Sequence, residues 1–338
     1  MQTSDFEYQL PPELIAQHPV QPRDASRLLV LHRGLGLEHR YFRDLPEYLR
    51  PGDCLVLNDT RVLRARLFGR RRDTGGRVEF LLLRPLSDGR WETLVRPGRR
   101  ARPGVEIDFS AGDCRLTATV DARTATGGRV VTFTSDLNLD QAIDHLGVVP
   151  LPPYITAALE DDERYQTVYA GPKGSVAAPT AGLHFTPALL EQIRNLGVQV
   201  AKVTLHVGLG TFRPVGVEDL KQHSMHAEYY QLNAETADLI NSARRVVAVG
   251  TTVARTLETT ADAGGQIRPG CGWTDLFIYP GYQFRAVDVL LTNFHLPRSS
   301  LLMLVCAFAD REEVLAAYRD AVGQRYRFYS FGDAMLII

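Results

Sequence analysis

The stretch SVAAPTAGLHFTPALLEQIRNLGVQVAKVTLHV, residues 175–207, decides the fold class of this chain. Its apolar pattern predicts a strand, a helix at 187–196 and a second, longer strand. Thr186 can cap the start of the helix, Pro187 suits the first helical position, and Gly197 can adopt the left-handed turn that ends it. A strand, a helix and a strand in succession indicate an α/β protein.

The same alternation continues on both sides of an inserted segment. Strands are predicted at 54–57, 175–178, 198–207, 246–249, 277–279, 287–293 and 334–338. Helices are predicted at 187–196, 234–244, 253–260, 299–309 and 312–322. The two ends of the chain, residues 1–60 and 136–338, are therefore predicted to form one discontinuous α/β domain.

The inserted segment, residues 61–135, has a different rhythm. Short alternating runs lie at 62–68, 78–83, 91–95, 105–109, 116–121 and 130–133. Gly, Pro and Asp between them, as in DTGG and RPGRRARPG, supply the backbone angles that tight turns need. This pattern indicates an antiparallel barrel or a compact sandwich, and we predict an inserted six-stranded antiparallel β-barrel domain.

Charge is distributed unevenly along the chain, although the formal net charge is only -1. Residues 59–130 hold sixteen Arg, no Lys and nine acidic side chains, a surplus of +7 that leaves -8 for the rest. A general preference for Arg over Lys explains the residue type but not this separation. A basic barrel beside an acidic body suits the docking of a polyanion such as RNA, although a solvated basic face without a partner has the same composition.

Targeting and cysteine patterns exclude several classes. The N-terminus MQTSDFEYQL lacks the basic start and apolar stretch of a signal peptide, and the apolar run 301–309 is about half a bilayer-spanning length. The four cysteines form no C-x-x-C pair, so neither a disulfide framework nor a thiolate zinc site is supported. We therefore expect a cytoplasmic protein without a membrane segment.

Four loops have the composition of ligand-binding loops at the carboxyl ends of strands. They are residues 58–61 (NDTR), 177–186 (AAPTAGLHFT), 250–252 (GTT) and 292–295 (TNFH). Each of them alone reads equally well as a capped helix start. Together they predict one pocket lined from several sides.

The loop 177–186 carries the most varied chemistry. Gly182 allows a ligand to approach the backbone, Thr180 and Thr186 offer hydroxyl groups, and His184 offers a titratable imidazole. We predict that this loop holds a polar ligand.

Two further segments contain histidine. LHVGLGTF, residues 205–212, fails as a dinucleotide fingerprint because a third glycine and a following helix are missing, so it suits only a glycine-rich wall. HSMHAE contains His223, His226 and Glu228, whose spacing differs from that of H-E-x-x-H zinc helices. Metal binding, proton transfer and an ordinary surface segment remain open for it.

The chain resembles the S-adenosylmethionine:tRNA ribosyltransferase-isomerase family of queuosine biosynthesis. Seven motifs in order carry the resemblance, almost from end to end: LPPELIAQHPVQPRDASRLLVL, LNDTRVLRARL, AAPTAGLHFT, LHVGLGTF, HSMHAEYY, VGTTVARTLE and TNFHLPRSSLLMLV. The family is described as two domains, one of them a β-barrel insertion. This agrees with the domain organisation predicted above.

The resemblance implies an unusual reaction. The ribosyl part of S-adenosylmethionine is moved onto 7-aminomethyl-7-deazaguanine at the tRNA wobble position and isomerised, which gives epoxyqueuosine and releases adenine and methionine. S-adenosylmethionine is thus a consumed substrate, and no cofactor, metal or obligate protein partner is expected. We expect a monomer, because no large apolar surface is evident in the sequence.

The resemblance also suggests roles for residues. The general base that starts opening of the ribose ring, and an acid for adenine, are sought among His184, His206, His226 and Glu228. Contacts to S-adenosylmethionine are predicted for Thr180, Ala181, Gly182, Thr186, Gly208, Gly210, Thr251, Thr252, His295, Arg298 and Ser299. Contacts to tRNA phosphates are predicted for Arg61, Arg64, Arg66, Arg70, Arg71, Arg72, Arg99 and Arg100.

Two other functions remain open at this point. A metal-dependent hydrolase would use His223, His226 and their neighbours, and purified protein would then contain stoichiometric metal. A non-enzymatic RNA-binding protein would bind RNA without a pocket for a sulfonium nucleoside.

Overall fold

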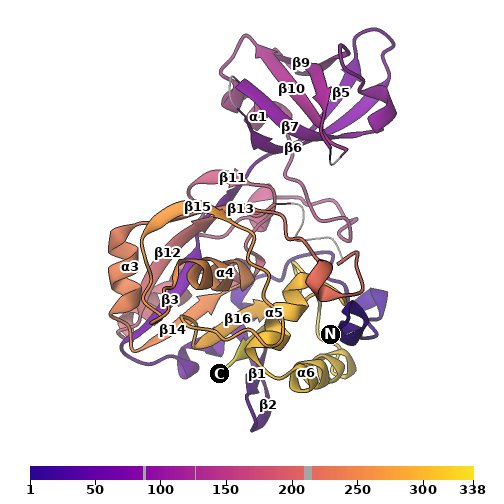
Figure 1. The fold of residues 1–338 in the computed structure, drawn as a ribbon. Helices are drawn as coiled ribbons and strands as arrows, with labels where there is room; N and C mark the ends of the chain where they lie inside the picture. Colours follow the sequence, from indigo (N-terminus) through magenta and orange to yellow (C-terminus); the bar gives the residue numbers. More distant parts are fainter. Residues whose placement is uncertain (87–88, 126, 209–214) are drawn as a thin grey trace. The chain divides into compact units, whose positions relative to one another are not determined.

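The computed structural model describes residues 1–86, 89–125, 127–208 and 215–338, which form two compact units. The first unit consists of Met1–Arg61, Pro152–Pro172 and Ala178–Ile338, and it contains a large mixed sheet with helices. The second consists of Val62–Leu151 and Lys173–Ala177, and it contains a closed six-stranded barrel (Figure 1). The predicted fold class is confirmed.

The sheet of the first unit has nine strands in the order β15-β13-β12-β3-β14-β16-β17-β1-β2. Their bounds are β1 (Arg27–His32), β2 (Gly36–Tyr41), β3 (Asp53–Asn58), β12 (Gln199–Leu205), β13 (Glu228–Leu232), β14 (Arg245–Val249), β15 (Gly270–Thr274), β16 (Val289–Asn293) and β17 (Ala334–Ile337).

Strand direction decides which loops meet at one edge of this sheet. The strands β12, β3, β14 and β16 are parallel, so the loops that follow them share an edge. β17 is antiparallel to β16, and β1 is parallel to β17. The segments that precede β17 and β1 therefore lie at the same edge as the loops that follow the four parallel strands.

Helices cover both faces of the sheet, because the strand side chains alternate between two apolar cores. Cys54 and Val56 of β3 belong to the core that contains α3 (Ala234–Asn241), α4 (Thr251–Thr260), α5 (Ser300–Phe308) and α6 (Arg311–Gly323). Leu55 and Leu57 of the same strand belong to the core that contains α2 (Pro187–Asn195). All five helices predicted from the sequence are confirmed within a few residues.

Several predicted strands were wrong. Residues 277–279 form no strand, although Phe277 and Tyr279 pack against the core as partly buried aromatic side chains. The strand predicted at 175–178 does not enter the large sheet, and only β11 (Lys173–Ser175) forms there, paired with β4 (Arg61–Val62).

Four strands of the large sheet, β1, β2, β13 and β15, were not predicted. β1 is apolar throughout and shows no alternation, whereas β2 is largely exposed at the edge of the sheet. Neither pattern gives the half-buried alternation by which a strand is recognised.

The barrel of the second unit closes because β9 pairs with β10. Its strands are β5 (Arg66–Arg71), β6 (Arg77–Pro85), β7 (Arg90–Arg96), β8 (Glu106–Ala111), β9 (Cys114–Arg123) and β10 (Arg129–Ser135). The first predicted run, 62–68, is divided between β4 and β5. A Cβ atom at Gly69 would lie 2.7 Å from side-chain atoms of Ile107 and Phe109, so a larger residue at position 69 would not fit against β8.

This unit also contains a helix that the sequence did not predict, α1 (Leu139–Leu146). Ala142 and Ile143 are its buried residues, and α1 contacts β5, β8, β9 and β10. A Cβ atom at Gly147 would lie 1.9 Å from the carbonyl oxygen of Arg64, so the chain after α1 passes directly over the barrel backbone. The unit extends past Ser135 for this reason.

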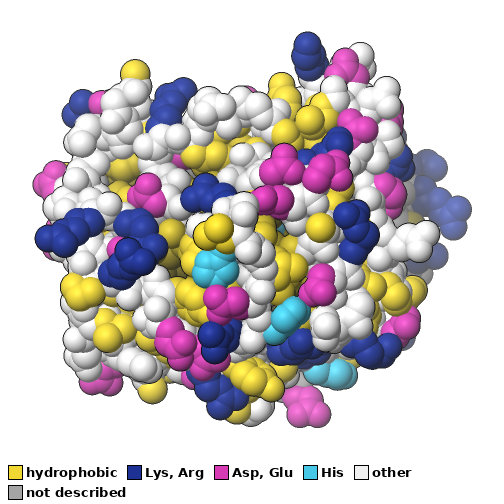
Figure 2. Space-filling view, turned by 90° about the horizontal axis from the view of Figure 1, so that it is seen from below, with side chains coloured by type: hydrophobic (Ala, Val, Ile, Leu, Met, Phe, Trp, Pro, Cys, Tyr) yellow, Lys and Arg dark blue, Asp and Glu magenta, His cyan; other side chains and the backbone are white. Residues whose placement is uncertain are grey.

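The surface is mixed in charge on the face that Figure 2 shows, where Lys and Arg alternate with Asp and Glu. The residues outside 59–130 carry a surplus of acidic side chains, but these produce no uniformly acidic region on that face. Among the helices described, none combines the length and the apolar character needed to cross a membrane.

Candidate functional site

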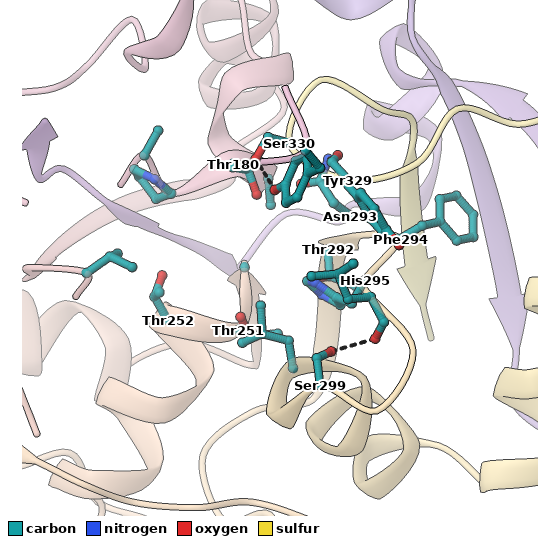
Figure 3. Close-up of a pocket in the computed structure, with 18 residues that line it drawn as sticks. Thr180, Thr251, Thr252, Thr292, Asn293, Phe294, His295, Ser299, Tyr329 and Ser330 are labelled. Atoms are coloured by element: carbon teal, nitrogen blue, oxygen red, sulfur yellow. Dashed lines mark hydrogen bonds between the residues drawn. The ribbon is translucent and has the colours of Figure 1, made fainter. Parts of the chain in front are cut away.

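A cavity that is partly open to solvent lies in the α/β unit at the carboxyl ends of the parallel strands (Figure 3). Three of the four predicted loops line it, together with residues before β17. Six of the predicted ligand-contacting residues are among those that line it: Thr180, Ala181, Thr251, Thr252, His295 and Ser299. The expected convergence of separate loops on one cavity is therefore observed for these segments.

The first turn of α4 forms one side of the cavity. Gly250, at φ 90°, is the N-cap of this helix, and no side chain caps it. The first backbone N–H groups of a helix have no partner within the helix, and the helix dipole makes this end positive. Because Gly250, Thr251 and Thr252 all line the cavity, these groups can bind an oxygen-rich or anionic ligand.

His295 lies on the opposite side, directly after β16. Its Nε2 atom is 2.7 Å from Oγ1 of Thr292, and its carbonyl oxygen accepts a hydrogen bond of 2.5 Å from the hydroxyl of Tyr8. Burial lowers the pKa of His295 from 6.5 to about 3. At neutral pH the cavity therefore contains a neutral imidazole in a fixed orientation.

Asn293, the last residue of β16, contributes a buried amide that was not among the predicted site residues. Its Nδ2 atom lies 3.1 Å from Nε2 of His184, 3.3 Å from the carbonyl oxygen of Tyr329 and 3.4 Å from that of Asp333. Its Oδ1 atom is buried and has no hydrogen-bond partner among the described residues. A buried acceptor without a partner costs about 1–3 kcal/mol, so a ligand N–H or O–H group that reached this atom would remove that cost.

Two tyrosines add an aromatic wall to the cavity. The ring centroids of Tyr154 and Tyr329 are 4.8 Å apart, and the hydroxyl of Tyr154 lies 2.8 Å from Oγ of Ser330. Tyr329 has φ 71°, a left-handed conformation that is costly for a bulky residue and that concentrates at functional sites. Flat ligands such as nucleobases stack favourably on such side chains.

His184, the first predicted catalytic residue, does not line this cavity. Its ring stacks on Phe42 with centroids 4.8 Å apart, and Nδ1 lies 2.7 Å from Oγ of Ser26. Because the amide nitrogen of Asn293 donates to carbonyl groups, Nε2 of His184 accepts from it and the proton lies on Nδ1. His184 thus holds Asn293 from behind the cavity wall.

The two buried histidines predict acid sensitivity. Burial lowers the pKa of His184 and of His295 from 6.5 to about 3, and for His184 nearby Arg327 and Arg23 add to the effect. Below pH 6.5 the unfolded chain binds two protons that the folded chain does not bind until about pH 3. We therefore expect the free energy of unfolding to fall with decreasing pH, by about 1.4 kcal/mol per pH unit for each histidine.

Urea unfolding between pH 7 and pH 5 measures this dependence. A His184→Asn variant should lose about half of the slope. A slope that is unchanged in this variant would contradict the prediction.

Four other predicted ligand contacts have structural partners outside the cavity. A Cβ atom at Gly182 would lie 2.1 Å from Oη of Tyr169, so this glycine is required by packing. Thr186 caps α2 through the N–H of Leu189, and Arg298 forms ion pairs with Glu7 and Glu218. Gly208 donates its N–H to Oε1 of Glu228 at 2.8 Å. Gly210 lies outside the described residues.

The remaining predicted acid–base residues also lie outside the lining. Glu228 is buried in an ion pair with Arg255, and His226 is exposed. His206 is partly buried, with Nδ1 2.7 Å from Oγ1 of Thr60, and burial lowers its pKa although nearby Asp59 opposes the shift. Within the described ranges, no group of three His, Cys, Asp or Glu side chains could hold a metal ion.

The predicted RNA-contacting arginines are partly neutralised by their own neighbours. Arg61 pairs with Glu163, Arg71 with Asp73, Arg66 with Glu79, and Arg72 with both Glu106 and Asp108. Arg64 and Arg100 donate to backbone carbonyl groups, and Arg99 is exposed.

A groove on the barrel still contains a surplus of positive charge. Five arginines line it with only two carboxylates, Glu79 and Asp108, and the exposed ring of Phe68 lies among them. The five are Arg70, Arg71, Arg72, Arg77 and Arg96, of which the last two were not predicted.

Comparison with known proteins identifies the family. The family model described as queuosine biosynthesis protein matches residues 3–337. This chain belongs to the queuosine biosynthesis protein family. Relatives in this family named S-adenosylmethionine:tRNA ribosyltransferase-isomerase are 61% identical in Symbiobacterium thermophilum and 59% identical in Moorella thermoacetica, each over 100% of both chains.

A solved structure is also similar to this chain. The crystal structure of S-adenosylmethionine tRNA ribosyltransferase from Thermotoga maritima is 44% identical, with a TM-score of 0.57. The match covers 99% of this chain and 100% of that one.

Proposed function

We propose that this protein transfers and isomerises the ribosyl moiety of S-adenosylmethionine onto 7-aminomethyl-7-deazaguanine at the tRNA wobble position. Epoxyqueuosine-tRNA, adenine and methionine are the products. The observation that carries the proposal is identity of 61% over the whole length of a relative named for this activity. The cavity supports it, since a helix N-terminus, an aromatic pair and a buried amide suit a nucleoside.

In this proposal S-adenosylmethionine occupies the cavity. The nucleobase of this ligand stacks on Tyr154 and Tyr329. Its oxygen atoms bind the first turn of α4 at Thr251 and Thr252. The Oδ1 atom of Asn293 accepts an N–H or O–H group of the ligand. These three contacts fix the orientation of the nucleoside relative to the sheet.

The reaction needs a base for the ribose carbon beside the sulfonium. Of the four predicted bases, His206 has the best placement, because the next residue, Val207, lines the cavity. Thr60 holds Nδ1 of His206, so Nε2 is the atom that would accept the proton. Asp59 favours the protonated form that results from this step.

The test of the proposed function is direct. The protein is incubated with S-adenosylmethionine and tRNA that carries 7-aminomethyl-7-deazaguanine. Free adenine is then followed by chromatography, and the mass of the wobble nucleoside is measured. Release of adenine together with a heavier nucleoside supports the proposal. Binding of both substrates without adenine release would overturn it and would favour an RNA-binding protein.

We further propose that the barrel groove holds the tRNA backbone. Arg70, Arg77 and Arg96 have no carboxylate of the described residues within 4.0 Å, so their charge is available for phosphates. Phe68, 60% exposed in the same groove, offers a ring on which an unpaired base can stack.

Replacement of these three arginines by Gln should weaken tRNA binding about 10-fold or more and reduce its salt slope by about 1 per arginine. Affinity for S-adenosylmethionine should stay unchanged. The matched control is Arg84→Gln, because Arg84 is exposed on the same barrel but pairs with Glu92. Equal tRNA affinity and salt slope in the triple variant and the control would contradict the docking proposal.

We also propose that the protein is a cytoplasmic monomer that needs no metal and no protein partner for this reaction. The basis is the chemistry that the family resemblance implies. Sedimentation of the purified protein and assays in the presence of a chelator test these points.

A further inference from the structure

A second, smaller cavity lies next to the first, in the same α/β unit. Three arginines line it: Arg23 from the segment before β1, Arg327 from the segment before β17, and Arg164 from a 3₁₀ helix at Asp162–Tyr165. Ser26 and His184 complete its polar lining together with Ser330, which also lines the first cavity.

The guanidinium groups of these arginines bind carbonyl oxygens. Arg23 donates to the carbonyl oxygens of Leu183 and Glu163 at 3.0 and 2.9 Å, and Arg164 donates to that of Val20 at 2.6 Å. These bonds hold the side chains in place, and a carbonyl oxygen does not neutralise a guanidinium charge.

No carboxylate of the described residues lies within 4.0 Å of Arg23 or Arg164. Arg327 has one at 3.7 Å, Asp333, whose carboxylate also accepts the backbone N–H groups of Arg27 and Arg327. On the barrel, by contrast, Arg72 pairs with two carboxylates. The second cavity therefore has a surplus of positive charge.

The charges around this cavity disfavour one another when it is empty. Burial lowers the pKa of Arg23, and the charge of Arg164 lowers it further, whereas Asp161 and Glu163 partly compensate. Burial likewise lowers the pKa of Arg164 and of Arg327. An anion in the cavity would relieve this repulsion.

We propose that the second cavity is an oxyanion site, in which Arg23, Arg164 and Arg327 bind a carboxylate or phosphate group. Planar guanidinium groups bind both groups through paired hydrogen bonds. Ser330 lines both cavities, so the proposed oxyanion site is adjacent to the first cavity.

The identification of the bound oxyanion rests on the proposed function, because that function supplies the candidate ligands. It is either the methionine carboxylate of S-adenosylmethionine or a backbone phosphate of the tRNA. Both are oxyanions, and the two are distinguished by the substrate whose affinity depends on the arginines.

The experiment uses Arg164→Gln and Arg327→Gln, with Arg194→Gln as a matched control, since Arg194 is exposed on α2 of the same unit. Inorganic phosphate is the probe, and its dissociation constant is measured by calorimetry in each protein. We expect phosphate to bind at least 10-fold more weakly to the two cavity variants than to the parent protein. The control variant should bind phosphate as tightly as the parent protein does. Thermal unfolding confirms that each variant is folded, and Arg164→Lys provides a second variant that retains the charge.

Dissociation constants for S-adenosylmethionine and for tRNA are then measured without turnover, so the result does not depend on the proposed reaction. A 10-fold loss for S-adenosylmethionine alone assigns the carboxylate, and a loss for tRNA with a smaller salt slope assigns a phosphate. Phosphate binding that disappears in the cavity variants while both substrate affinities stay unchanged would overturn a substrate role. Phosphate affinity equal to that of the control in both cavity variants would overturn the site itself.

Discussion

Asn293→Leu is expected to weaken the binding of S-adenosylmethionine about 10- to 100-fold. Leu has the branched shape of Asn but is larger and has no acceptor, and Oδ1 of Asn293 is a buried oxygen without a partner among the described residues. One hydrogen bond to a ligand of this kind contributes about 1–3 kcal/mol, which corresponds to this range of affinity. Calorimetry with S-adenosylmethionine measures the loss.

The variant also removes the donor to His184 and to the carbonyl oxygen of Tyr329, so stability must be separated from binding. Asn293→Asp serves as the matched control, because it keeps an oxygen in the position of Oδ1 and, when protonated, one donor. We expect Asn293→Asp to lose stability but to retain most of its affinity for S-adenosylmethionine. Equal affinity in the Leu and Asp variants would show that this atom does not contact the ligand.

The sequence predicted the position of the site better than its individual residues. Loops after parallel strands share one edge of a sheet, so 177–186, 250–252 and 292–295 were expected to converge, and residues of all three line the cavity. The sequence could not predict which loop side chains line the cavity, because a histidine in such a loop can face either the ligand or the core. His184 faces the core against Phe42, whereas His295 lines the cavity.

Tyr329 and Ser330 were missed because the direction of the last strand could not be read from its sequence. If β17 had been parallel to β16, the segment before it would lie at the opposite edge of the sheet. Since β17 is antiparallel, Tyr329 lies beside the end of β16, and its N–H donates to the carbonyl oxygen of Phe294 at 3.2 Å. The aromatic and polar composition of YSFGD was the available signal, but it can be interpreted only when the direction of β17 is known.

Charge counts were informative for the domain but not for single arginines. The surplus of Arg in residues 59–130 is real, yet Arg72 is neutralised by two carboxylates that are 34 and 36 residues away in the sequence. Arg23, outside that block, has no carboxylate of the described residues within 4.0 Å. Pairing depends on strand register and loop packing, which the composition does not contain.

Arg255→Met is expected to lower the free energy of unfolding by about 3–5 kcal/mol. Arg255 of α4 and Glu228 of β13 form an ion pair in which each side chain is 4% exposed, and Arg255 also donates to the carbonyl oxygen of Leu276 at 3.1 Å. Removal of the arginine leaves a buried carboxylate without its counterion. Urea unfolding of the variant and the parent protein measures the difference.

The double variant Glu228→Gln/Arg255→Met separates this structural role from a catalytic one. Gln at position 228 keeps an oxygen that can accept the N–H of Gly208, and no charge is left buried, so most of the stability should return. Because Glu228 does not line the cavity, adenine release by the double variant should stay within a few-fold of the parent rate. A double variant that is as stable as the parent but inactive would instead support Glu228 as the general base, since loss of folding could not then explain the loss of activity.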